Sequence, residues 1–231
     1  MEFDHKIVIV GGGHSAQRFV EALLFDTNLS ITLTGRKGGN AERLSKKFGL
    51  EFYPWDEFLF RVENYFQPSI VIFSTKLGTK FDLLQNLYKV GYKNSLVLEK
   101  PLSLSLEKID SIQRLIESRN VVCFIPFTRE FSDEYKMNFK ILPEEILLEW
   151  PFIELGIDPL VHQGAHMMHF LAMNFEEYKI ELKTVKREGT DYHFEGNIGD
   201  NKLICRLISD STGKKQFALN GRSFPKINHL L

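Results

Sequence analysis

Three consecutive glycines follow a short run of β-branched residues near the start of the chain. Residues 6–10 predict a strand, and the sequence then has the spacing G-x-G-x-x-A and changes to a helical period. In such a turn the first glycine permits the bend, the second lets the backbone approach a pyrophosphate, and the small third residue packs helix against strand. Amides at the start of the helix receive the anion. The pattern predicts a dinucleotide site, with a purely structural glycine turn as the alternative. The expected contacts are Gly11, Gly13, His14, Ser15 and Ala16.

The end of the second predicted strand, residues 30–34, is the position that distinguishes NAD from NADP. An NAD site usually carries Asp or Glu about 20 residues beyond the glycine turn, bonded to the ribose 2′-hydroxyl. This stretch has no acid and carries two cations. A guanidinium binds a 2′-phosphate through its planar fork, so the stretch favours NADP(H) over NAD(H), with a solvated basic loop as the alternative. The residues concerned are Thr34, Gly35, Arg36 and Lys37.

A lysine ends the fifth predicted strand, residues 95–98, in the run Glu99-Lys100-Pro101. Ligands of open α/β sheets bind outside the carboxyl ends of the strands, which is where Lys100 is expected. The alternative is a surface lysine before a rigid proline turn.

Three histidines occur in a predicted helix over residues 160–173, namely His162, His166 and His169. At about 100° per residue they lie within about 60° of one face. They extend over about 10 Å along the axis, so one ion could readily take only two of them. We expect no metal site and interpret the face as one for proton transfer. A metal stripe and ordinary helix packing are the alternatives.

The elements that must position these residues alternate between strand and helix in the first half. Strands are predicted at 6–10, 30–34, 52–53, 69–75, 95–98 and 121–127. The helices between them include one from 41 to 48 that ends at Gly49, and one capped by Ser105 with Leu106, Ile109, Ile112 and Ile116 on one face. Another amphipathic helix follows the glycine turn, with Leu24 as the last residue of its apolar face. Repeated right-handed crossovers imply a doubly wound parallel sheet.

The second half has a different pattern. Strand-like runs occur at 146–150, 179–185, 192–198, 203–208 and 216–219, and we expect the later ones to form an antiparallel meander. The run 179–185 alternates like a half-exposed strand. The predicted fold is therefore α/β: an N-terminal Rossmann domain (residues 1–125) followed by a smaller α+β domain with a mainly antiparallel sheet (residues 126–231).

Composition narrows the classes of partner. The 231 residues are 43% hydrophobic, and 29 Lys+Arg balance 30 Asp+Glu, so nothing favours a nucleic-acid partner. Cys123 and Cys205 lie in apolar runs and are interpreted as core thiols. No signal peptide and no apolar run of about 18–20 residues is found, which predicts a cytoplasmic protein without a membrane partner. A small-molecule substrate is expected, and a homodimer or protein partner is compatible with this.

Taken together, the glycine turn and Glu99-Lys100-Pro101 resemble the Gfo/Idh/MocA family of glucose-fructose oxidoreductase-like and inositol dehydrogenase-like enzymes. Phe127-Thr128-Arg129-Glu130-Phe131 is similar to that family's exit from the Rossmann domain, and Gly164-Ala165-His166 to its helix facing the nicotinamide. Two acids common in that helix are replaced by His162 and His169. The loop at 75–80 lacks the usual proline and histidine; its Lys76 and Lys80 favour an anionic substrate or are simply solvated. The resemblance thins out after residue 175, and the second domain is shorter than in most relatives.

The resemblance implies hydride transfer between a nicotinamide and a carbonyl, alcohol or imine carbon. It implies that Lys100 stabilises or protonates the developing alkoxide and that His166, with His162 as a further candidate, is the acid/base. It also implies that the cofactor is bordered by Ser74, Thr75, Lys76, Glu99, Lys100, Pro101 and Arg129. The leading prediction is an NADP(H)-dependent oxidoreductase acting on a small polar, sugar-like or secondary-metabolite substrate. The alternative is a non-catalytic dinucleotide-binding regulatory or scaffold protein.

Overall fold

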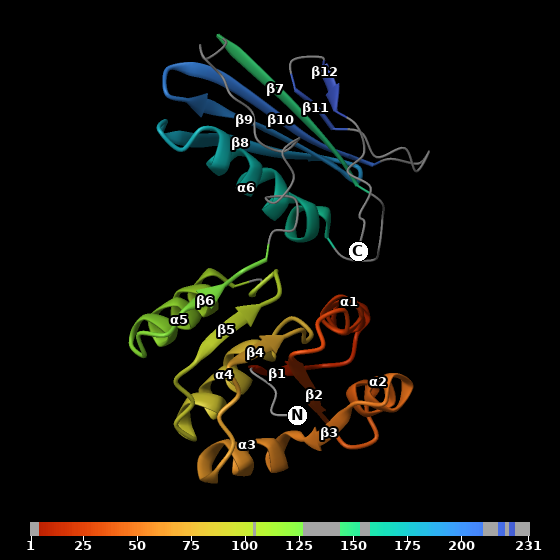
Figure 1. Cartoon of the computed structure of the whole chain (residues 1–231). Helices are drawn as coiled ribbons and strands as arrows, with labels where there is room; N and C mark the ends of the chain where they lie inside the picture. The colour runs from red at the N-terminus through yellow and green to blue at the C-terminus, as the bar shows by residue number, and fades with distance from the viewer. Residues whose placement is uncertain are drawn as a thin grey trace. The chain divides into compact units, whose positions relative to one another are not determined.

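The computed structural model of the chain describes residues 5–103, 105–126, 144–152, 158–209, 217–219 and 222–224. Within these ranges Pro151, Val161, His162 and the residues of 217–219 and 222–224 are described by their backbone alone. The chain divides into two compact units, with the boundary between residues 126 and 127. Each unit is described by itself, unit 1 before the boundary and unit 2 after it (Figure 1).

Unit 1 is the doubly wound parallel sheet predicted from the sequence. Its strands are β1 (His5–Val10), β2 (Leu29–Gly35), β3 (Glu51–Pro54), β4 (Ile70–Phe73), β5 (Ser95–Leu98) and β6 (Cys123–Phe124). Its helices are α1 (His14–Leu23), α2 (Asn40–Phe48), α3 (Trp55–Asn64), α4 (Lys80–Lys89) and α5 (Leu106–Glu117). The strand order is β3-β2-β1-β4-β5-β6, and every neighbouring pair is parallel.

The central strand β1 shows why a continuous apolar run is required. Ile7 and Ile9 point to the face covered by α1 and α2, where they pack with Val20 of α1. Val8 and Val10 point to the opposite face and pack with residues of α3, α4 and α5. Alternate residues of one strand therefore enter two separate cores, as expected of a sheet covered on both faces.

Local signals set the helix ends. Gly49 adopts the left-handed conformation, with φ of 66°, and ends α2, while the Ser105 hydroxyl accepts the Lys108 amide at the start of α5. Two predicted apolar positions are wrong. Leu24 is 43% exposed and Leu106 79% exposed, because each lies at a helix terminus, where the apolar face no longer meets the sheet.

The described residues of unit 2 form a mixed sheet and one helix that packs on it. Its elements are β7 (Glu145–Phe152), a π-helical turn (Leu160–Gly164) that continues as α6 (Ala165–Asn174), and β8 (Ile180–Glu188), β9 (Asp191–Ile198), β10 (Asn201–Ser209), β11 (Phe217–Leu219) and β12 (Arg222–Phe224). Apolar side chains of β7, β9 and β10 form one core with Met167, Phe170 and Leu171 of α6. No helix in the described ranges is long and apolar enough to cross a membrane.

The predicted meander is only partly right. β8, β9 and β10 do pair in antiparallel succession, but the sheet order is β12-β11-β7-β10-β9-β8. β7 therefore lies between β10 and β11 and runs parallel to β10. Side-chain alternation reports which face of a strand is buried but not its direction or its partner, so this insertion was not visible in the sequence. β8 is also more exposed than predicted, because it is the edge strand and only Ile180 of its residues is partly buried.

Candidate functional site

The carboxyl ends of four strands of unit 1 form one row. The paired residues in that row are Val10 with Thr34, Val10 with Phe73, and Phe73 with Leu98. The amides of the next residues continue the ladder: Gly11, Ser74 and Glu99 each donate to a carbonyl of this row, at 3.0, 2.9 and 3.0 Å. The residues predicted from the glycine turn and from the ends of β2, β4 and β5 are therefore brought to one edge of the sheet.

Two of the three glycines are required by close packing within the protein. Gly11 has φ of +114°, and a Cβ added to it would overlap the carbonyl group of Ser74. A Cβ on Gly12 would overlap the backbone of Asn40 and Ala41 at the start of α2. Gly13 differs, because a Cβ built on it would meet nothing within 4 Å. The turn is therefore tightly packed at Gly11 and Gly12 and open to space at Gly13.

The start of α1 fits an anion in that open space. The first amides of a helix have no acceptor within the helix and carry its partial positive charge. Here no side chain caps them, and the first turn contains no acidic residue. His14 is exposed and Ser15 half-buried, while Ala16 is fully buried between helix and sheet. The predicted role of Ala16 in packing thus agrees with its surroundings, and the donors fit a phosphate group.

The segment after β2 is basic and open. Gly35 is the last residue of β2, and a Cβ there would come to 3.0 Å from the Ala41 Cβ, which leaves little room for a larger side chain. Arg36 and Lys37 are exposed. Glu42, in the first turn of α2, accepts the Gly38 amide at 2.7 Å and the Lys46 ammonium at 2.8 Å. These two partners hold the pKa of Glu42 below its ordinary value, so its charge is already balanced.

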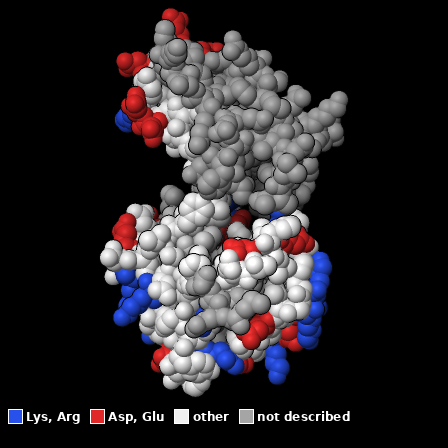
Figure 2. Space-filling view, in the orientation of Figure 1, with Lys and Arg blue, Asp and Glu red and all other residues white. Residues whose placement is uncertain are grey.

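An open hollow of about 240 Å³ lies beside the glycine turn and was missed in the sequence. It is lined by Gly12, Asn40, Arg43, Leu44 and Lys47. The Arg43 guanidinium donates to the Asn40 side chain at 2.6 Å. In Figure 2 blue Lys and Arg side chains gather, with acidic ones among them, along the edge of unit 1 where Figure 1 places α2. A sequence signal for these residues was present: Arg43 and Lys47 are basic residues four positions apart on a predicted helix, so they lie on the same helix face.

The loop after β4 contains one exposed and one buried lysine. Lys76 is exposed, as a solvated or substrate-attracting cation would be. Lys80 is 3% exposed, and its ammonium donates to the carbonyls of Thr75 and Pro101, both at 3.1 Å. The interpretation of Lys80 as solvated or anion-binding is therefore wrong, because its ammonium is engaged by protein carbonyls. Ser74 is also buried, and the buried Thr75 hydroxyl has no hydrogen-bond partner within the described residues.

Glu99 and Lys100 follow β5 and are both half-buried. Burial raises the pKa of Glu99 above its ordinary value, although the positive charges of Lys100, Lys80 and Arg18 act in the opposite direction. Arg18 comes from α1, so charges from three elements meet at this carboxylate. The Lys100–Pro101 peptide bond is cis.

In unit 2 the predicted site residues are only partly described. His166 lies in α6 and is buried, as is the neighbouring Gln163, whose side-chain oxygen accepts the Trp150 indole N–H at 3.2 Å. His162 lies in the π-helical turn, and its side chain is outside the described part, as is all of Arg129. Among the side chains that are described, no group of three or more His, Cys, Asp or Glu is placed to hold a metal ion.

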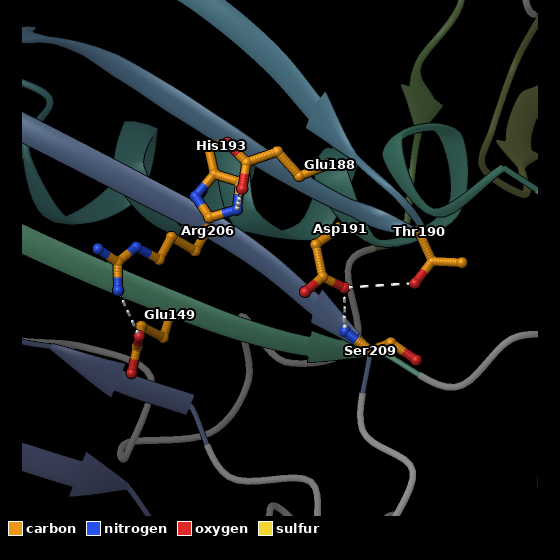
Figure 3. Close-up of polar contacts among 7 residues, drawn as sticks. All are labelled: Glu149, Glu188, Thr190, Asp191, His193, Arg206 and Ser209. Carbon is orange, nitrogen blue, oxygen red and sulfur yellow. Dashed lines mark hydrogen bonds and ion pairs between the residues drawn. The ribbon is translucent and has the colours of Figure 1, made fainter.

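Several polar side chains on the face of the unit 2 sheet opposite its core form pairs with one another (Figure 3). Arg206 contacts Glu149 at 3.3 Å and His193 contacts Glu188 at 3.6 Å. Asp191 accepts the Ser209 amide at 2.7 Å. These contacts join neighbouring strands, and we assign them a structural role.

Comparison with known proteins identifies a family with the same kind of fold as unit 1. Residues 5–127 match the family model GFO_IDH_MocA, described as an oxidoreductase family with an NAD-binding Rossmann fold. The structure is similar to that of a putative myo-inositol dehydrogenase from Sinorhizobium meliloti 1021, with a TM-score of 0.74 and 11% identity over 96% of this chain and 76% of that one. A likeness at this identity concerns the fold alone.

Two curated relatives are similar in sequence. One is a glutamyl-tRNA reductase from Saccharolobus islandicus, 25% identical over 219 residues, which are 93% of this chain and 45% of that protein. The other is scyllo-inositol 2-dehydrogenase (NAD(+)) from Bacillus subtilis, 30% identical over 99 residues, which are 42% of this chain and 27% of that protein. The matched segment thus covers less than half the length of either relative.

Proposed function

The chain belongs to the Gfo/Idh/MocA oxidoreductase family, and on this premise we propose that it is an NADP(H)-dependent oxidoreductase acting on a small polar substrate. The reaction moves a hydride between the nicotinamide and a carbonyl, hydroxyl or imine carbon of that substrate. The observation that carries the proposal is the turn after β1, where Gly11 and Gly12 are tightly packed while Gly13 and the uncapped start of α1 face open space.

The basic segment after β2 supports NADP(H) over NAD(H). Arg36 and Lys37 are exposed where the ribose is expected, and the nearby acid Glu42 is already bound to Gly38 and Lys46. A 2′-phosphate would meet two cations there and no unbalanced carboxylate. In this proposal the adenosine end of the cofactor lies on the β2 side of the turn.

The order of the strands supports a position for the other end of the cofactor. β4 and β5 lie on the opposite side of β1 from β2, and in this proposal Ser74, Thr75 and Lys100 border the nicotinamide half. The buried Thr75 hydroxyl has no hydrogen-bond partner within the described residues, and because buried polar groups usually have one, this supports a ligand group at this end of the sheet. When bound, the cofactor supplies or accepts the hydride, as in other enzymes that use it.

The protein contributes a cation and an acid/base. We assign to Lys100 the stabilisation or protonation of the developing alkoxide, and to Glu99 the balance of the positive charge around it. His166 is proposed as the acid/base, with His162 as a further candidate. The proposal for the histidines rests on the family resemblance of the helix that carries them.

The inositol dehydrogenases among the similar proteins suggest polyols and cyclic ketoses as first substrates. A tRNA-linked substrate, as the name of the other relative implies for that protein, is less favoured here. The formal net charge is −1 and the sequence contains no basic block, whereas proteins that bind polyanionic RNA carry an excess of basic residues on one face.

The experiment is a fluorescence titration of the full chain with NADPH and NADH, followed by a substrate screen that follows nicotinamide absorbance. We expect tighter binding of NADPH and turnover of at least one polyol, sugar or imine. Binding without turnover across the screen would favour the non-catalytic alternative. Absence of binding to both nucleotides would contradict the proposal.

A further inference from the structure

The ammonium of Lys80 is buried at the start of α4 and joins two loops at the carboxyl ends of the unit 1 strands. It donates to the carbonyl of Thr75, in the loop after β4, and to the carbonyl of Pro101, in the loop after β5, at 3.1 Å each. These acceptors are 5 and 21 residues away in sequence. One side chain therefore holds together two loops whose other link is the pairing of the strands that precede them, β4 and β5.

Packing alone does not account for a lysine at this position. Burying an ammonium is costly unless it is paired and hydrogen-bonded, and an apolar side chain would fill the same space without that cost. Burial lowers the pKa of Lys80, and the negative charge of Glu99 opposes this effect. The two carbonyls and the Glu99 carboxylate thus together offset the desolvation of this charge.

Both loops carry residues assigned to the site. Pro101 directly follows Lys100, and Thr75 directly follows Ser74, whose carbonyl lies against Gly11. A shift of the Pro101 carbonyl would move Lys100 with it, and a shift of Thr75 would change the floor beneath the glycine turn. Small displacements of this kind are enough to lower the rate of a positioned reaction.

We propose that Lys80 is a positioning residue, which ties the Lys100–Pro101 turn to the loop after β4 and so sets the place of Lys100 at the nicotinamide half of the cofactor. The inference rests on the proposed function, since it presumes a dinucleotide at this edge. It predicts that loss of Lys80 affects the nicotinamide half and leaves the adenosine half, held on the β2 side of β1, unchanged.

The test compares a whole cofactor with its adenosine half. Lys80→Met and Lys80→Arg are made in the full chain, and each is titrated with NADPH and with 2′,5′-ADP. For Lys80→Met we expect NADPH affinity to fall about tenfold, equivalent to about 1.4 kcal/mol, with 2′,5′-ADP affinity unchanged within about twofold. Lys80→Arg keeps the charge and the donors, and is expected to recover at least half of the lost binding free energy.

The matched control is Lys89→Met, which removes an exposed lysine at the other end of the same helix and should leave both affinities unchanged. If Lys80→Met does not fold, Lys80→Gln, whose NH₂ group can still donate to a carbonyl, is measured in the same way. Parallel loss of both ligands would mean a general structural role and overturn the inference, as would unchanged NADPH binding. Failure of the proposed cofactor site is distinguishable, because the unsubstituted chain would then bind neither ligand, and binding without turnover would leave this comparison of affinities intact.

Discussion

At the scale of single residues, three positively charged side chains surround one carboxylate at the carboxyl ends of the unit 1 strands. Glu99 is half-buried beside Lys100, Lys80 and Arg18, which come from β5's loop, α4 and α1. Burial favours the neutral form of the carboxyl, and the cations favour its charged form. Lys80 donates to the carbonyls of Thr75 and Pro101. We assign Lys100 to the reacting atoms because the run Glu99-Lys100-Pro101 resembles that of the family.

Substitution of Lys100 by alanine tests that assignment. Lys100→Ala is expected to lower turnover by at least about 100-fold, as for loss of a positioned proton donor, while NADPH affinity stays within about tenfold. Single-turnover absorbance and fluorescence titration measure the two quantities. Lys93→Ala, at an exposed position before β5, is the control. Equal loss of binding and turnover would instead make Lys100 an anchor for the cofactor.

Arg36 is tested by cofactor discrimination. Arg36→Ala is expected to weaken NADPH binding about 10- to 100-fold, because a hydrogen bond to a charged group contributes about 1.5–3 kcal/mol. NADH, which lacks the 2′-phosphate, should bind within about twofold of its original affinity. Arg114→Ala removes an exposed arginine on α5 and should change neither. A uniform effect on the two nucleotides would contradict a 2′-phosphate contact.

At the scale of elements, the β1 turn and α1 are held by contacts on one side and left open on the other. The Gly11 backbone lies against β4 and the Gly12 backbone against α2, whereas Gly13 faces free space with an ordinary extended backbone, φ −80° and ψ −173°. Contacts with neighbouring segments therefore explain why residues 11 and 12 are glycines. They do not explain Gly13, and a bound ligand is the reason we propose for that glycine.

Two alanine substitutions separate these roles. Gly11→Ala is expected to destabilise the protein by at least about 2 kcal/mol, because it combines a positive φ with overlap against the Ser74 carbonyl. Gly13→Ala should cost about 1 kcal/mol or less, as the change of an N-cap glycine, yet weaken NADPH binding at least tenfold. Thermal unfolding and fluorescence titration provide the measurements. If Gly13→Ala bound NADPH normally, the phosphate would not lie against this residue.

At the scale of the whole molecule, the two units have separate cores and each carries one cysteine. Cys123 lies in β6 of unit 1 and Cys205 in the core of unit 2. Burial raises the pKa of the Cys123 thiol to about 11 and that of Cys205 to about 12. The thiolate is the reactive form, so at pH 8 both thiols are held in the unreactive form and Cys205 is the less reactive.

Alkylation of the native chain at pH 8 tests this arrangement. We expect Cys205 to be labelled only as unit 2 unfolds, so its rate should rise steeply with urea, while Cys123 is labelled faster. Raising the pH towards 11 should increase the rate at Cys123, since its thiolate fraction grows. Mass spectrometry of the Cys123→Ser and Cys205→Ala variants assigns each rate. Labelling of native Cys205 as fast as a free thiol would contradict its burial.

The residues that act through local rules were readable from the sequence. The apolar runs of β1 and β4, the 3.6 period of α1 and α2, the left-handed Gly49 and the Ser105 cap depend on neighbours a few residues away, and the parallel order follows from their alternation. The glycine turn and Glu99-Lys100-Pro101 were found for the same reason, because each motif is contiguous.

What only the tertiary structure decided concerns partners distant in sequence. Lys80 resembles a surface lysine in its own segment, and only the fold brings Pro101 to its ammonium. Gly12 is tight because α2 starts against it, and β7 enters the second sheet beside β10, 57 residues away along the register. The sequence by itself determined where the glycine turn forms and that Lys100 follows the fifth strand. Long-range packing decided which glycine is open and which lysine is buried, because a contact between segments leaves no period in either of them.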